Sequence, residues 1–171
     1  MRIWLFEFLR DLVRCMNSVE RNVNEERFAP IVLVARALRD YLLATYDVAV
    51  DGDRLVPASP TAAPLTIVIS DFPQVKVLAG AAGNERFPQC GCDACDEDVE
   101  ELAEMLERYV FSVVNGGFQE TWRKRNMHVS WSDEHGGASW SLLRQEVDRD
   151  RLAALKARGK DAHWEPWSVP G

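Results

Sequence analysis

Residues 97–131 read EDVEELAEMLERYVFSVVNGGFQETWRKRNMHVSW, and this stretch decides the fold class. Apolar residues recur every three or four positions in its first half, which predicts a helix over 97–115. Two glycines after Asn115 end that helix, because glycine adopts the left-handed conformation that follows many helices. Apolar and polar residues then alternate over 118–131, which predicts antiparallel strands. A long helix followed by consecutive strands is typical of an α+β fold.

The flanking segments extend this pattern to the whole chain. We expect a mostly antiparallel sheet of about five strands, with helices packed mainly on one face. The expected strands are 65–70, 75–79, 117–124, 127–132 and 138–143. The expected helices are 3–23, a second from Pro30 to near Tyr46, 97–115 and 148–158. One domain over 1–160, followed by an extended C-terminal tail over 161–171, accounts for these elements.

The same periodicity selects a core and one helix cap. We expect Asp96 to cap the 97–115 helix, because an aspartate side chain accepts hydrogen bonds from the unpaired amides of a first turn. The residues expected to be largely buried are Leu38, Leu42, Ile67, Ile69, Leu102, Leu106, Val110 and Trp131.

Composition restricts the class of protein and its partners. The chain has 171 residues, of which 47% are hydrophobic and 27% charged, as in folded globular domains. Its net charge of −7 repels a phosphate backbone, so we expect no nucleic-acid partner. No apolar run reaches the ~18 residues of a membrane span, so we expect no membrane partner. Glu7, Arg10 and Asp11 interrupt the apolar N-terminus, which argues against a signal peptide and favours the cytoplasm.

Three of the four cysteines fall within six residues, in the string Cys90-Gly-Cys92-Asp-Ala-Cys95. A C-x-x-C step brings two thiolates onto one zinc ion, and the C-x-C step adds a third. Gly91 permits the tight backbone that the shorter step requires. We therefore predict a zinc site formed by Cys90, Cys92 and Cys95, with His128 as the expected fourth ligand.

Other fourth ligands and other states of the cluster remain open at this point. His135, His163, Cys15, Asp93 and a water are also candidates for the fourth position. A protein ligand there closes a structural site, whereas a water leaves the open position of a catalytic site. An iron–sulfur cluster normally takes four cysteines. The remaining alternatives are a reduced loop without metal and a labile disulfide between two of the thiols.

Four stretches of the chain together resemble one known family. They are ERFAPIVLVARALRDYLLATYDV, PLTIVISDFPQVKVLAG, FPQCGCDACDEDVEELAEMLE and VFSVVNGGFQE. They resemble an uncharacterised bacterial domain-of-unknown-function family built around a CGCDACD motif, over about residues 25–120. The resemblance implies that Cys90, Cys92 and Cys95 belong to the family's pattern. It implies no catalytic residue, substrate or cofactor.

The sequence lacks the common catalytic signatures: there is no G-x-S-x-G, P-loop, dinucleotide-binding glycine pattern or H-E-x-x-H. We therefore expect a non-enzymatic accessory or regulatory domain that binds a protein partner and carries a structural zinc-type cluster. The alternative is a metal- or thiol-dependent enzyme that uses the cluster with an open coordination position. The number of protein ligands around the metal distinguishes the two hypotheses.

Overall fold

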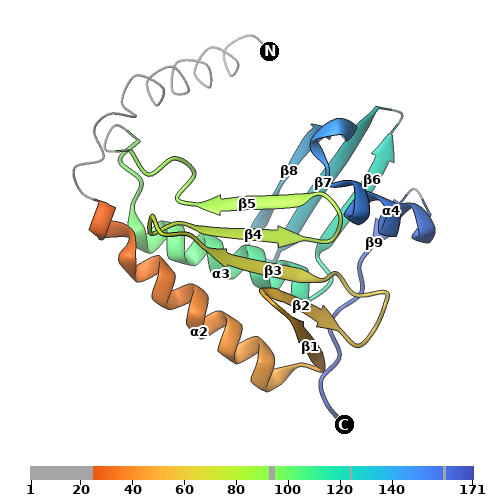
Figure 1. Ribbon diagram of the computed structural model, residues 1–171, viewed down its shortest axis with the longest axis horizontal. Helices are drawn as coiled ribbons and strands as arrows, with labels where there is room; N and C mark the ends of the chain where they lie inside the picture. The colour runs from red at the N-terminus through yellow and green to blue at the C-terminus, as the bar shows by residue number, and fades with distance from the viewer. Residues whose placement is uncertain (1–24, 93–94, 124, 160) are drawn as a thin grey trace.

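The computed structural model describes residues 25–92, 95–123, 125–159 and 161–171. In these residues nine strands form two antiparallel sheets, which confirms the predicted α+β fold class (Figure 1). The N-terminal sheet has the order β1-β2-β3-β4-β5, and the C-terminal sheet has the order β8-β7-β6-β9. The strands are β1 (Val48–Asp51), β2 (Arg54–Pro57), β3 (Leu65–Ile69), β4 (Val75–Ala79), β5 (Gly83–Phe87), β6 (Phe118–Arg123), β7 (Asn126–Asp133), β8 (Gly136–Leu143) and β9 (Asp161–His163).

The helices lie close to their predicted positions. They are the 3-10 turns η1 (Glu25–Phe28) and η2 (Arg144–Glu146), and the α-helices α2 (Ala29–Thr45), α3 (Val99–Val114) and α4 (Arg149–Arg158). Pro30 occupies the first turn of α2, where its missing amide hydrogen costs no hydrogen bond. The helix predicted over 3–23 lies outside the described residues.

The predicted cap of α3 is wrong by two residues. Asp98, and not Asp96, caps the helix: its carboxylate accepts hydrogen bonds from the Glu100 and Glu101 amides. Asp96 has a φ of 45°, a left-handed conformation that belongs to the loop before the helix. The run of consecutive acidic residues hid the difference, because several of them have a side chain suited to capping.

The strands divide between two sheets, whereas the sequence predicted one. Strand β5 is not among the expected strands; it pairs with β4 in a register that runs from the pair Val75 and Phe87 to the pair Ala79 and Gly83. The sequence of β5, GNERF, lacks the alternation that marks a strand, because its inward positions are Gly83, Glu85 and Phe87. A polar residue at the central inward position concealed this strand.

The main core lies between the N-terminal sheet and the helices. Helix α2 packs against β3 and β4, α3 packs against β5 and β7, and the two helices contact each other. Of the predicted core residues, those buried in this interior are Leu38, Leu42, Ile67, Leu106, Val110 and Trp131. Two predictions need correction: Ile69 is 36% exposed at the end of β3, and Leu102 is only partly buried in the first turn of α3. Both residues lie near the end of their element, where the backbone leaves the buried interior.

The segment after residue 160 connects the two sheets. Strand β9 pairs with β6, and the chain then runs past the loop before β3 (Figure 1). Glu165 N donates to Thr61 O at 3.0 Å, and Trp167 Nε1 donates to Ala63 O at 2.8 Å. The indoles of Trp164 and Trp167 are buried, so this segment contributes to the interior.

Within the described ranges, no helix combines the length and the apolar character that crossing a membrane requires.

Candidate metal centre

The three clustered cysteines converge on one point in the loop that joins β5 to α3. We call residues 88–98 the cysteine loop. The Cys90 Sγ atom lies 3.0 Å from Cys92 Sγ and 3.0 Å from Cys95 Sγ, and Cys92 Sγ lies 3.3 Å from Cys95 Sγ. Among the residues that the structure describes, these form a group of potential metal ligands whose atoms all lie within 4.8 Å of one another. The predicted convergence of the three sulfurs is therefore present.

One side chain of the loop itself and two from the rest of the fold hold this loop in place. The Glu97 carboxylate accepts hydrogen bonds from the Gln89 amide at 2.9 Å and the Gly91 amide at 3.2 Å. Gln74 Nε2 donates to Pro88 O at 2.9 Å. Arg27 Nη2, from η1, donates to Cys92 O at 3.3 Å. The backbone around the sulfurs is thus organised by contacts that do not involve a metal.

Glycine is required at position 91 for two reasons. Its φ of +70° is a conformation that side chains rarely adopt, and a Cβ there would lie 2.5 Å from the Phe72 ring. The chain therefore turns tightly against an aromatic wall between Cys90 and Cys92. This turn lets the Cys92 amide donate to Cys90 Sγ at 3.4 Å, a contact that orients the sulfur, as outer-shell hydrogen bonds orient metal ligands.

The three cysteines differ in their surroundings. Cys92 is buried and Cys95 is exposed, so the cluster spans the boundary between interior and solvent. Burial first, and then the neighbouring Cys92 thiol, raises the pKa of the Cys90 thiol to about 11. The crowded site therefore disfavours thiolates unless a cation is bound.

The donor set fits a thiophilic ion. Zinc–thiolate bonds of about 2.3 Å in a tetrahedron place sulfurs about 3.8 Å apart. The observed separations of 3.0–3.3 Å are shorter, so the sulfurs need to move apart by less than about 1 Å. Three cysteines can hold a metal here, and the residues that would do so are Cys90, Cys92 and Cys95.

His128, the histidine predicted as fourth ligand, is not part of the described group of sulfur ligands. His128 is on β7, and its Nδ1 atom lies 3.3 Å from Ser141 Oγ on β8. His135 is in the exposed turn beside Glu134, and His163 is exposed on β9. None of these histidines belongs to the described group of sulfur ligands. Cys15 and Asp93, the other protein candidates, lie outside the described residues.

A second polar site, which the sequence did not reveal, holds the other end of β5. We call residues 80–82 the β4–β5 turn. Glu120 is fully buried, and its carboxylate accepts hydrogen bonds from the Ala81 and Ala82 amides and from Trp164 Nε1. Arg151 donates to the carbonyls on either side of the turn: Nη2 lies 2.8 Å from Ala79 O and 3.1 Å from Gly83 O.

The carboxylate of this second site is fully buried, whereas Arg151 is half-buried. Burial raises the pKa of Glu120, and the hydrogen bonds from Ala81, Ala82 and Trp164, together with the Arg151 charge, act against that shift. The only available sequence signal was a carboxylate at an inward position of a strand, which is rare unless it has partners. Its partners come from a turn and from α4, so the sequence did not identify them.

The fold and the cysteine loop define a class of protein: a small α+β domain with a cysteine-rich loop that leads into a helix. The chain belongs to a family of unknown function (DUF6226), whose sequence pattern matches residues 16–170. The predicted resemblance to an uncharacterised family is thereby confirmed, and the match is longer than the 25–120 on which it was based. No curated protein and no solved structure matches the chain.

Proposed function

We propose that the protein is a non-enzymatic cytoplasmic domain that binds a partner protein and is stabilised by a zinc ion at Cys90, Cys92 and Cys95. The observation that carries the zinc assignment is the approach of the three sulfurs to within 3.0–3.3 Å. Zinc suits this set because thiolates are its usual ligands in structural sites, and a reducing compartment keeps thiols available. The role of the zinc ion is to tie the end of β5 to the start of α3.

The fourth ligand distinguishes a structural site from a catalytic one. None of the three histidines belongs to the described group of sulfur ligands, so we favour Cys15, Asp93 and a water as candidates for the fourth position. A protein ligand closes the site and supports the structural role, whereas a bound water leaves the open position that zinc enzymes use. We favour the closed site, because the sequence contains none of the catalytic signatures considered above.

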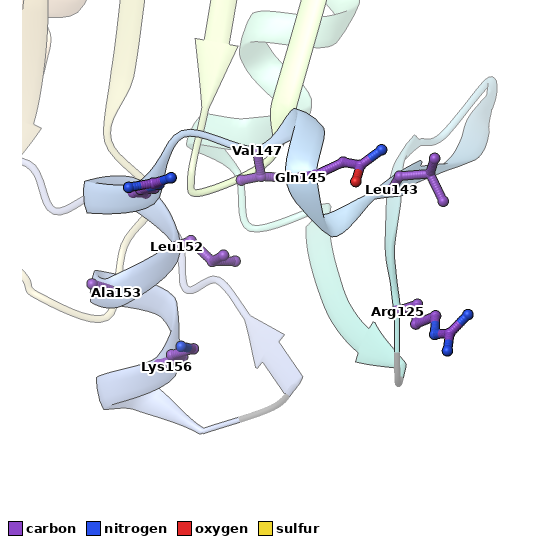
Figure 2. Close-up of a pocket in the computed structure, with 8 residues that line it drawn as sticks. Arg125, Leu143, Gln145, Val147, Leu152, Ala153 and Lys156 are labelled. Carbon is purple, nitrogen blue, oxygen red and sulfur yellow. The ribbon is translucent and has the colours of Figure 1, made fainter.

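A basic pocket supports the partner-binding role. Between residues 123 and 160 there are nine basic and five acidic residues, although the whole chain has 20 basic and 27 acidic. A pocket of about 710 Å³ opens there, between α4 and the β6–β7 turn (Figure 2). Arg125, Arg149 and Lys156 line it. Leu152 points from α4 into the space (Figure 2).

This combination indicates the chemistry of the partner. Cationic side chains around an apolar floor of Val147 and Leu152 complement a peptide that carries both carboxylates and apolar residues. No acidic residue lines the described pocket. We therefore assign the partner as a protein with an acidic, partly apolar segment.

The zinc assignment is tested by melting the full chain with and without a zinc chelator. Zinc at 100 times its Kd stabilises a folded state by about 2.7 kcal/mol, which is roughly 5–10 °C in a domain of this size. Cys95→Ser should abolish this response, and because Cys95 is exposed, the substitution removes little packing. His128→Ala is the matched control and should respond like the wild type.

Variants of the remaining candidates show how many protein ligands the zinc ion has. Cys15→Ser and Asp93→Asn should each be measured for zinc affinity, and a loss in one of them identifies the fourth ligand. If both bind zinc like the wild type, the fourth position holds water and the enzyme alternative gains support. A wild-type protein that shows no chelator response contradicts the zinc assignment.

The partner assignment is tested with a synthetic peptide of alternating Glu and Leu. Binding should weaken at least tenfold in Arg149→Ala and in Lys156→Ala, and stay within twofold in Arg39→Ala, a surface cation on α2 whose guanidinium bonds the β1–β2 turn. A single-stranded oligonucleotide is the competitor. If it binds more tightly than the peptide, the basic pocket serves nucleic acid and the partner proposal is wrong.

A further inference from the structure

Strand β8 forms one edge of the C-terminal sheet and lacks the protection that the other edge strands carry. It pairs with β7 on one side, and within the described ranges no strand pairs with its other side (Figure 1). Proteins usually protect such edges with charged side chains or prolines, because unpaired backbone groups attract another strand. Each of the other edge strands has a charged residue: Asp51 on β1, Glu85 on β5 and Asp161 on β9. The eight residues of β8, GGASWSLL, include neither a charge nor a proline.

The hydrogen-bond ladder shows which backbone groups of β8 point away from β7. Ser132 N donates to Gly117 O at 3.0 Å, on the β6 side of β7, and Ser132 lies opposite Gly137 of β8. Bonded and non-bonded pairs alternate along an antiparallel ladder. The N–H and C=O groups of Gly137, Ser139 and Ser141 are therefore directed outward, and all three residues are exposed.

This open edge ends at Leu143. Its amide is the next one to point outward, and it donates to Glu146 Oε2 at 2.6 Å. The stretch available for pairing is therefore 137–141. Its outward-directed residues are glycine and serine, whose small side chains leave the backbone accessible to another strand.

The two faces of β8 specify what a further strand must contain. Trp140 and Leu142 are partly buried and pack against the core on one face. Ser139 and Ser141 lie on the other face, where Ser141 Oγ is 3.3 Å from His128 Nδ1. A strand added at this edge continues both faces, so it should alternate apolar and polar residues.

The basic pocket begins where β8 ends. Leu143, the last residue of β8, lines that pocket together with Arg125, Arg149 and Lys156. A segment that pairs antiparallel with β8 has its N-terminal end beside Leu143, so its leading residues reach the pocket. Carboxylates there meet cationic side chains, which gives the edge and the pocket one complementary ligand.

We propose that the acidic, partly apolar segment of the partner binds β8 as an additional antiparallel strand. Its apolar residues lie beside Trp140 and Leu142, and its N-terminal carboxylates lie at the basic pocket. This inference rests on the proposed function, to which it adds the conformation and direction of the segment. All strand pairs within the two described sheets are antiparallel, and main-chain hydrogen bonds supply affinity when a peptide extends a sheet.

The test uses an N-acetylated peptide of about ten residues in which Glu and Leu alternate, titrated into the full chain. Peptide residues that bond Gly137, Ser139 and Ser141 have their side chains on the polar face, so they are the Glu residues. N-methylation of the backbone at three central Glu residues should weaken binding at least tenfold. N-methylation at three central Leu residues, in a peptide of the same composition and charge, should change the affinity less than threefold.

A proline at the edge tests the same contact from the protein side. Ser139→Pro removes the central outward amide without removing a hydrogen bond to β7, a position that tolerates proline, and should weaken binding at least tenfold. Val50→Pro, at an exposed position on the edge strand β1 of the other sheet, is the matched control and should bind within twofold of the wild type. If Ser139→Pro does not fold, the two methylated peptides decide the question on the wild-type chain.

The outcomes separate this inference from the proposed function. If the two methylated peptides bind equally well while binding still depends on Arg149 and Lys156, the added strand is wrong and the partner assignment stands. If the unmethylated peptide does not bind, both are wrong. If the chain alone is a dimer that Ser139→Pro converts to a monomer, the edge belongs to a second copy and the inference is overturned.

Discussion

The two ends of β5 are held in different ways. At its start, the β4–β5 turn is fixed by Glu120 and Arg151, which bond the backbone amides and carbonyls of the turn. At its end, the cysteine loop brings three sulfurs together, and Glu97 bonds the backbone on which they sit. The first arrangement is complete within the polypeptide. The second collects donor atoms of the kind that bind a metal.

Under the zinc proposal, the start of β5 is stable by itself, whereas the stability of the loop at its end depends on a bound ion. A buried carboxylate with satisfied partners stabilises a turn under any conditions in which the chain folds. A thiolate cluster stabilises its loop only when an ion is bound, so its contribution varies with metal concentration. Substitutions at the two ends of β5 should therefore respond differently to zinc.

The largest expected effect is at the β4–β5 turn. Glu120→Ala removes the acceptor of the Ala81 and Ala82 amides and leaves the Arg151 charge without its counter-charge. Breaking a buried charge arrangement on one side costs about 3–5 kcal/mol. Denaturant unfolding should show this loss equally with zinc and with chelator. Glu134→Ala, at an exposed carboxylate, should stay within about 0.5 kcal/mol.

A zinc-dependent loss for Glu120→Ala would contradict the comparison. It would mean that the β4–β5 turn and the cysteine loop fold as one unit, and that the Glu120 carboxylate affects stability through the cysteine loop.

A smaller effect is expected from Gly91→Ala in the cysteine loop. A left-handed residue with a Cβ costs about 1–2 kcal/mol, and this Cβ would also lie 2.5 Å from the Phe72 ring. Because the loop shapes the cluster, zinc affinity should fall about tenfold, equivalent to about 1.4 kcal/mol. Zinc titration against a chromophoric chelator measures it.

Gly52→Ala is the matched control for this substitution. Its φ is +59° and a Cβ there meets nothing within 4 Å, so it carries the same backbone strain away from the cysteines. It should lower stability while leaving zinc affinity unchanged. Equal loss of zinc affinity in both variants would show that general instability, and not the loop geometry, controls metal binding.

The smallest expected effect involves neither end of β5. Arg108 on α3 bonds Asp133 on β7 through Nε and Nη2, at 2.7 and 2.9 Å. The hydrogen bond from Arg108 lowers the pKa of Asp133 from 3.8 to about 2. The stability from this pair is therefore fully present above pH 3.8 and is lost as pH falls through about 2.

Asp133→Asn should remove that contribution at every pH. The melting temperatures of wild type and variant should differ slightly at pH 5 and converge toward pH 2. The difference should also shrink with added salt, because the pair is partly exposed to solvent. If the difference in melting temperature between wild type and variant persisted unchanged at pH 2, it would come from packing and not from the ion pair.

The sequence predicted those parts of the fold that local pattern determines. The α2 and α3 helices and strands β3, β4 and β7 follow from periodicity, because their buried faces are apolar. Strand β5 was missed because Glu85 occupies its central inward position, which is polar and borders a pocket. The division into two sheets also escaped prediction, since it depends on contacts between distant segments such as β6 and β9.

For the candidate site too, the sequence predicted only what local spacing determines. The spacing of Cys90, Cys92 and Cys95 is local, so their convergence followed from the sequence. The choice of His128 required the order and register of the strands, which place it opposite Ser141 on β8. Glu97 falls within the predicted 97–115 helix, whereas in the structure it precedes α3 and its carboxylate bonds the backbone of the cysteine loop. Its position two residues after Cys95 was the available signal.

The central claim, a zinc ion held by Cys90, Cys92 and Cys95, is tested most directly by X-ray absorption at the zinc edge. The protein should be purified without chelator and its metal content measured on the same sample. We predict about one zinc per chain with three or four sulfur neighbours at about 2.3 Å. A substoichiometric metal content after supply of zinc, or a zinc shell that contains only nitrogen and oxygen, would contradict the account.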